Sequence, residues 1–237
     1  MACSPDIDER ADAGFATPAA AVVSLGLAVV ASALTGAAVT QLRAARSDAA
    51  RTQAEYLLDG LQAQAGLAAL SSPKATRLAW TIAASSGAAE ILAESESAKL
   101  GLAEAPDFDG TMLAKLGVTD AGDVRRRVSA LTPQQAVGPA LEAADAAPQW
   151  RACARSLISA YGMAKTQPKL TPSPPTTGAV VWRIGEVWRI RVTASGWADD
   201  RIVRFTGDLL HPAAVVDRRF YRRAEGRDRC EALFAAS

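Results

Sequence analysis

The longest uncharged stretch of the chain, from Phe15 to Leu42, limits most strongly what this sequence can fold into. Its 28 residues exceed the roughly 20 that an α-helix needs to cross a lipid bilayer. A buried helix of a soluble domain is the alternative, but 28 residues without a charge are long for one. We therefore predict a membrane-spanning helix over residues 15–42, and its many small side chains favour close packing against other helices.

The residues that flank this stretch bear on cleavage and on orientation. Ala31, Ser32 and Ala33 fit the small-x-small pattern of a signal-peptide cleavage site, but residues 1–14 are acidic where a signal peptide is basic. Three arginines follow the stretch, at positions 43, 46 and 51. The positive-inside rule by itself would place the C-terminal body in the cytoplasm, so a cytoplasm-facing membrane protein is one hypothesis.

The helix is predicted to continue beyond the uncharged stretch. Apolar residues recur at three- and four-residue spacing between Tyr56 and Ala68, and no proline interrupts the chain before Pro73. Because a proline disfavours helix at the preceding residue, we expect one helix over residues 15–72.

Residues 73–163 are predicted to form a wholly helical insert of short segments that Gly, Pro or Asp separate. Asp120 or Thr119 can cap one of these helices, and Thr132 with Pro133 can begin the next. The proline-rich residues 164–178 then predict an extended linker.

Residues 179–237 change to a period of two, which predicts about four short strands and a C-terminal tail. The predicted strands are AVVWRI (179–184), the segment around Trp188 to Val192, the segment around Val203 and Phe205, and AVVDRRFYRR (214–223). Short connections between them favour antiparallel pairing. The chain is therefore expected to be an α+β protein, with a long helix packed on an antiparallel sheet and an inserted all-helical domain.

Gly14 and Phe15, placed before the uncharged helix, resemble the processing junction of type IV pilins and type II secretion pseudopilins. The resemblance implies that residues 1–14 are a leader, and that prepilin peptidase cuts after Gly14 and methylates the new N-terminus. It also implies a bacterial inner-membrane protein, single-pass, with its body in the periplasm. The stretch AEYLLDGLQAQAGLAAL (54–70) is similar to the membrane-distal helix of that class.

Ala19 stands where most members of the class have a glutamate. Lack of that acid and a large helical insert are typical of the minor pseudopilin K of type II secretion systems. The resemblance implies a non-enzymatic subunit at the pseudopilus tip, with the other minor pseudopilins, the major pseudopilin and the inner-membrane secretion platform as partners. A minor pilin of a type IV pilus, and a membrane-anchored periplasmic enzyme or binding domain, are the alternatives.

Cleavage after Gly14 would remove Cys3 and leave Cys153 and Cys230 in the exported body. In an oxidising periplasm these two can form a disulfide between the last insert helix and the C-terminal tail. Two unrelated thiols are the alternative, because the sequence does not show their distance.

Few residues suggest chemistry of another kind. His211 is the single histidine and lies in a predicted turn, so a histidine-dependent catalytic triad is disfavoured. No phosphate-binding loop occurs, and the net charge of +1 gives no global field for nucleic acid.

Four carboxylates of the insert are candidate calcium ligands, because calcium prefers oxygen ligands. They are Asp107, Asp109, Asp120 and Asp123. The DFDG sequence around Asp107 lacks the rest of an EF-hand loop, so a helix-capping turn is the alternative. The pseudopilin K resemblance implies calcium in the helical domain without assigning its ligands.

Overall fold

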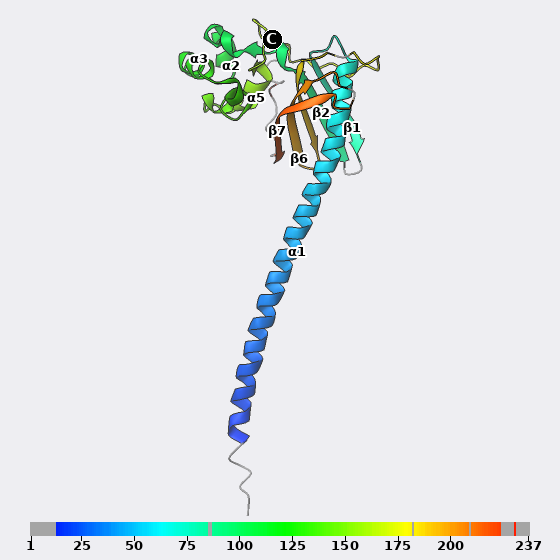
Figure 1. The fold of residues 1–237 in the computed structure, drawn as a ribbon. Coiled ribbons are helices and arrows are strands. Elements are labelled where there is room, and N and C mark those ends of the chain that lie inside the picture. Colours follow the sequence, from blue (N-terminus) through cyan, green and yellow to red (C-terminus); the bar gives the residue numbers. More distant parts are fainter. Residues whose placement is uncertain (1–12, 85–86, 182, 209, 224–229, 231–237) are drawn as a thin grey trace, which may run out of the picture. The chain divides into compact units, whose positions relative to one another are not determined.

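The computed structural model describes residues 13–84, 87–181, 183–208, 210–223 and 230, and it describes side chains from residue 20 onward. The chain divides into two compact units, residues 1–53 and residues 54–237. Helix α1 (Ala13–Ser71) belongs to both. Figure 1 shows the order of the elements along the chain.

The remaining elements all lie in the second unit. Its 3₁₀ and α-helices are η1 (Glu96–Ala98), η2 (Leu102–Asp107), α2 (Gly110–Lys115), α3 (Ala121–Ser129), α4 (Pro133–Val137), η3 (Glu142–Ala144) and α5 (Pro148–Leu157). Its strands are β1 (Arg77–Ala84), β2 (Gly87–Ser95), β3 (Leu100–Gly101), β4 (Ile158–Ser159), β5 (Val187–Ala194), β6 (Trp197–Phe205) and β7 (Ala213–Arg222).

Five strands form one antiparallel sheet in the order β1-β2-β5-β6-β7. Ser195 and Gly196 connect β5 to β6 with positive φ angles of 54° and 76°. Two such residues give the tight turn that matches the twist of a hairpin. The three predicted strands after residue 186 and their antiparallel pairing are confirmed.

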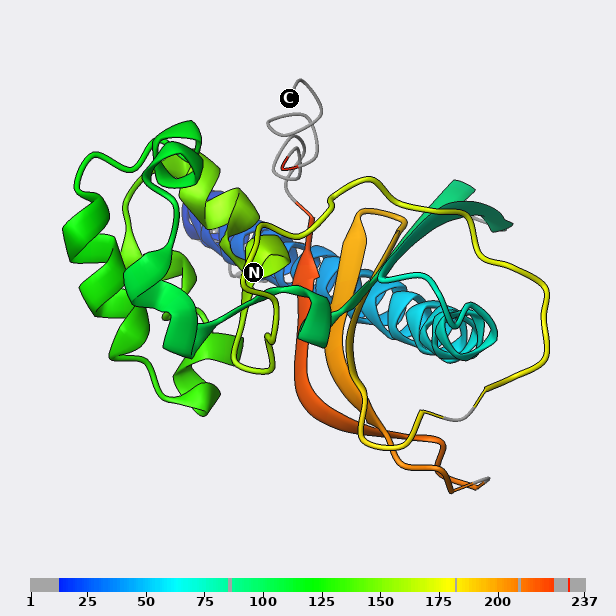
Figure 2. The same ribbon diagram turned by 90° about the horizontal axis from the view of Figure 1, so that it is seen from above.

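The second half of α1 packs on one face of this sheet. Its buried apolar residues include Leu58, Leu61, Ala65 and Ala69, which recur at spacings of three and four. They meet an apolar sheet surface that includes Ile91, Trp188, Ile190 and Val192. Figure 2 shows the sheet between residues 54–71 of α1 and the helices α2 to α5. The α+β architecture and the packing of the helix on the sheet are therefore confirmed.

A buried polar side chain also joins α1 to the sheet. The Gln62 side-chain amide donates hydrogen bonds to the backbone carbonyls of Ile190 at 3.1 Å and Asp199 at 2.8 Å. These two carbonyls belong to neighbouring strands, so Gln62 fixes the position of α1 along the sheet.

The short helices enclose a core of their own around the buried Trp150. Its indole N–H donates to the carbonyl of Leu141 at 3.0 Å, which satisfies the one polar atom of the ring. Thr132 caps α4, as the sequence predicts, and it forms a capping box with Gln135.

The prediction of a wholly helical insert over residues 73–163 is wrong at the two-residue strands β3 and β4, and above all for residues 77–95. These residues form β1 and β2, although their many alanines favour helix. The side chains of Leu78, Trp80 and Ile82, at alternate positions of β1, lie on the side of the sheet that faces α1. Gly87 takes a φ of 119° at the start of β2. Pairing of β2 with β5 outweighs the local helix preference, because it completes the face that covers α1.

The prediction of a strand at residues 179–184 is also wrong for those that the structure describes. This segment belongs to the long connection between β4 and β5 and passes the end of α1, where the Val181 N–H donates to the Leu70 carbonyl at 3.1 Å. That bond satisfies a helix-terminal carbonyl in place of a strand partner.

Replacing Leu58 by alanine tests the packing of α1. Since Leu58 is completely buried against the sheet, Leu58→Ala should lower the free energy of unfolding of the body by about 2–5 kcal/mol. Leu67→Ala removes the same atoms from a side chain of the same helix that is 55% exposed. It should change the free energy of unfolding by at most about 1 kcal/mol. Denaturant titration of the full chain in detergent measures both, and equal losses would contradict this packing.

Candidate functional site

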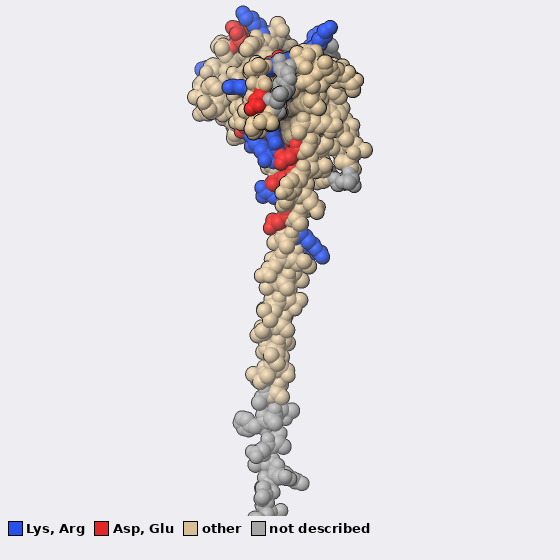
Figure 3. Space-filling view, turned by 45° about the vertical axis from the view of Figure 1, so that its right-hand side comes forward, with Lys and Arg blue, Asp and Glu red and all other residues tan. Residues whose placement is uncertain are grey.

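The exposed apolar part of α1 is the first feature along the chain that bears on function. Every residue from Ala20 to Gln53 is exposed, and no charged side chain occurs in it before Arg43. Figure 3 shows this long stretch of α1 without charged side chains, followed by basic and acidic ones. The helix is long and apolar enough to cross a membrane.

Hydroxyl side chains inside this apolar stretch bond to their own helix. Ser32 donates to the carbonyl of Val29, Thr35 to that of Ala31, and Thr40 to that of Gly36, at 2.8 to 2.9 Å. Such bonds satisfy hydroxyl groups without water, which a helix surrounded by lipid requires.

The predicted processing junction lies at the start of α1. Gly14, Phe15 and Ala19 fall within the first helical turns, and their side chains lie outside the described part of the chain. Leader residues 1–12 are likewise outside it. The processing and assembly roles of these residues stay predictions.

The sheet face that looks away from α1 carries two rows of alternating charge. Arg77 pairs across the strands with Glu94, and Glu94 with Arg189. In the second row, Asp200 lies between Arg191 and Arg219. Directly opposite residues share a face, so each acidic side chain in these rows has an arginine on either side.

Lys99, which directly follows η1, also belongs to this charged face. It is almost completely buried, and its ammonium lies 3.3 Å from Glu94, forms a second ion pair with Glu96 and donates to the Arg155 carbonyl at 2.8 Å. The hydroxyl of Ser159 in β4, the short strand after α5, donates a hydrogen bond to the Glu96 carboxylate. Burial of Lys99 is tolerated because these acceptors replace its water.

Charge pairing sets the protonation of the buried acids. Burial alone would raise the pKa of Glu94, but Lys99 and Arg77 outweigh it and lower that pKa. The Asp200 carboxylate accepts two hydrogen bonds from Arg189, one of them at 2.7 Å, and this pair holds the pKa of Asp200 well below its usual range despite burial. Both acids are therefore charged at neutral pH.

Arg155 of α5 links the helices to the same face. Burial and the nearby positive charge of Arg189 lower the pKa of Arg155 to about 10, so it too remains charged at neutral pH. It forms an ion pair with Glu142, which also lies 3.5 Å from Arg219 of β7. The cavity beside Arg155 and Arg189 measures about 10 Å³, which is room for about one water molecule and not for a substrate.

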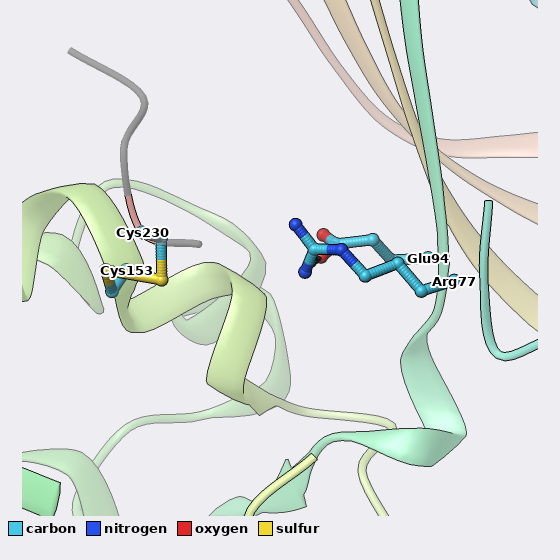
Figure 4. The surroundings of a disulfide bond; sticks show 4 residues. All are labelled: Arg77, Glu94, Cys153 and Cys230. Atoms are coloured by element: carbon cyan, nitrogen blue, oxygen red, sulfur yellow. Dashed lines mark hydrogen bonds and ion pairs between the residues drawn. A yellow bond between two sulfur atoms is a disulfide. The ribbon is translucent and has the colours of Figure 1, made fainter. Parts of the chain in front are cut away.

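Cys153 of α5 and Cys230 form a disulfide with their Cα atoms 5.0 Å apart. Figure 4 shows this bond on the helical side and the Arg77 guanidinium beside the Glu94 carboxylate on the sheet. Because Cys230 lies eight positions after the end of β7 at Arg222, the bond ties the chain after the last strand to α5. The structure thus brings together the two cysteines that the sequence suggested.

The four calcium candidates are not brought together. Asp109 caps α2 by accepting from the Thr111 N–H at 2.9 Å, and Asp120 caps α3 by accepting from the Asp123 N–H at 2.9 Å. Asp123 pairs with the arginines that follow it, and Asp107 ends η2. Within the described residues, no group of three or more His, Cys, Asp or Glu side chains could hold a metal ion.

His211 lies in the β6–β7 connection with its side chain 82% exposed and 3.4 Å from Asp208. The charged interface between the sheet and the helices is the feature that sequence reasoning missed. The arginines of WRIRV (188–192) and the aspartates of WADDR (197–201) were a signal for it, but their burial depends on what covers the sheet.

Comparison of the chain with protein-family models, with curated proteins and with solved structures finds no match. The structure and the physical chemistry of the residues therefore carry the functional argument.

Acid should destabilise the body through Asp200 and Glu94. Their folded-state pKa values are lowered, so their stabilisation is complete above about pH 5 and is lost as pH falls below about 4. Asp200→Asn should lower the unfolding free energy by about 3–5 kcal/mol at pH 7, because Arg189 loses its charged partner, and the difference from wild type should shrink in acid.

Denaturant titrations at several pH values, followed by the fluorescence of the buried tryptophans, measure this effect. Asp208→Asn, at a carboxylate 54% exposed, is the matched control and should leave the pH profile unchanged. A wild-type stability that does not fall below pH 4 would contradict the ion-pair interpretation.

Reduction should weaken the body through the Cys153–Cys230 bond, which closes a loop across 77 positions. We expect reductant to lower the unfolding free energy by about 2–5 kcal/mol. A Cys153→Ser, Cys230→Ser double variant should start at the reduced value and not respond to reductant. Alkylation of the denatured, unreduced protein checks the pairing, and two labelled cysteines in that sample would rule it out.

Proposed function

We propose that this protein is a minor pseudopilin of a type II secretion system, of the K subtype, and acts at the pseudopilus tip to support protein export across the outer membrane. One observation carries the proposal. A single helix is uncharged and exposed over its first part, and then buries an apolar stripe on an antiparallel sheet. That combination suits a subunit whose helix lies in a bilayer and later among sister helices.

Assembly would use the exposed apolar part of α1. Its small side chains permit close approach of neighbouring helices in an apolar medium. Ala19 supplies no carboxylate to meet the N-terminal amine of another subunit, and a buried carboxylate needs such a partner. A subunit without this contact suits the end of a filament better than its repeating body.

The part of the body formed by helices α2 to α5 would lie beside the sheet and cap the tip in the periplasm. The Lys99–Glu94 ion pair would connect it to the sheet, and the disulfide would connect it to the chain after β7. Partners would be the other minor pseudopilins, the major pseudopilin, prepilin peptidase and the inner-membrane platform. The role is non-enzymatic, and calcium would not be needed to hold Asp107, Asp109, Asp120 and Asp123 in place.

A membrane-anchored enzyme or binding domain is the second candidate function. It would be favoured by carboxylates of shifted pKa converging on a pocket. The buried acids with lowered pKa values, Glu94 and Asp200, are instead paired with arginine or lysine, and the cavity beside Arg155 and Arg189 is too small for a substrate. The tip-subunit proposal therefore has the stronger support, and a minor pilin of a type IV pilus remains its variant.

N-terminal sequencing of the protein from bacterial membranes tests the proposal. We expect Phe15, methylated, as the first residue of the mature chain, and Gly14→Ile should leave the leader attached because it blocks the peptidase site. Gly26→Ile is the matched control, since nothing lies within 4 Å of that glycine's side-chain position. Retention of Met1 in the assembled protein would overturn the proposal.

A reporter fused after Ser237 decides the side of the membrane. Activity of a periplasm-dependent reporter is expected, and activity of a cytoplasm-dependent one alone would favour the orientation that the arginines at 43, 46 and 51 suggest.

A further inference from the structure

The end of the apolar part of α1 carries a pair of arginines on one helix face. Arg43 and Arg46 are three positions apart, so their side chains are neighbours, and both are exposed. Helix α1 continues through them without interruption. No acidic side chain occurs in the described sequence before Asp48.

The apolar stretch ends directly before these arginines. From Phe15 to Leu42 the helix rises about 42 Å at 1.5 Å per residue, against about 30 Å of hydrocarbon in a bilayer, so the stretch is long enough to place Arg43 at the edge of the hydrocarbon. Arg46 lies about 4.5 Å beyond Arg43 along the axis. Long basic side chains at that depth can extend toward the phosphates.

We propose that Arg43 and Arg46 bind the phosphate groups of anionic phospholipids and thereby fix the depth of α1 in the membrane. This inference rests on the membrane-spanning role proposed above. A guanidinium can donate two parallel hydrogen bonds to one phosphate, so neighbouring arginines suit this ligand. In a second copy of the chain in register, the acid nearest to these arginines is Asp48, which follows both of them.

Lipid retention by the purified full chain tests the inference. The protein is equilibrated in mild detergent with equal amounts of phosphatidylglycerol and phosphatidylcholine, and retained lipids are measured by mass spectrometry. We expect a several-fold preference for phosphatidylglycerol, reduced to near equality in an Arg43→Gln, Arg46→Gln variant. The matched control, Arg126→Gln with Arg127→Gln, removes two exposed arginines of α3 and should keep the preference.

Three results would overturn the inference. They are equal retention of both lipids by the wild type, an unchanged preference in the Arg43→Gln, Arg46→Gln variant, and equal loss in the α3 control. Dimers that only the wild type forms, without a lipid preference, would instead assign the arginines to a second copy. Normal processing to Phe15 in a variant that lacks the lipid preference would show that the lipid contact and the proposed function are tested separately. Retention of Met1 would overturn the proposed function alone.

Discussion

The apolar contact between the second half of α1 and one face of the sheet is the interaction on which the rest of the second unit depends. Leu58 and Ala65 are completely buried there, and the strand residues that receive them alternate along β2 and β5. Because side chains of a strand point alternately to two faces, committing one set to α1 sends the intervening residues to the other face. Those residues include Arg189 and Glu94.

Lys99, which directly follows η1, and Glu142 of η3 form ion pairs with charged side chains of that second face. A lone buried charge would be strongly destabilising, yet each of these arginines and acids meets an opposite charge. Buried ion pairs contribute little net free energy compared with apolar contacts, but their geometry is specific. We interpret the network around Lys99 and Arg155 as what orients the helical part against the sheet, with the disulfide as a covalent second link.

A single helix meets two different surroundings in this protein. Its first part has no buried residue from Ala20 to Gln53, and its polar hydroxyls turn back to the helix backbone. Its second part has a buried stripe and a buried Gln62 that bonds to two strands. An element of this kind is suited to join an apolar medium to a folded body, and the proposed roles in lipid binding and filament assembly both rest on that division.

Much of the local structure was determined by the sequence itself. Pro73 ended α1 close to the predicted residue, the period of two predicted β5, β6 and β7, and the Asp120 and Thr132 caps were visible because capping requires only neighbours in the chain. The possible Cys153–Cys230 pair was also visible, although its distance was not.

Only the tertiary structure decided the identity of residues 77–95 and the burial of the charged face. Alanine-rich segments prefer helix when considered alone, but β2 gains a partner about 100 positions away in β5, as in the pairing of Glu94 with Arg189. Burial of Lys99 depends on distant residues that the fold brings close: the Arg155 carbonyl accepts from Lys99, and Ser159 donates to its ion-pair partner Glu96. Contacts between distant residues supply that free energy, and a local pattern does not contain them.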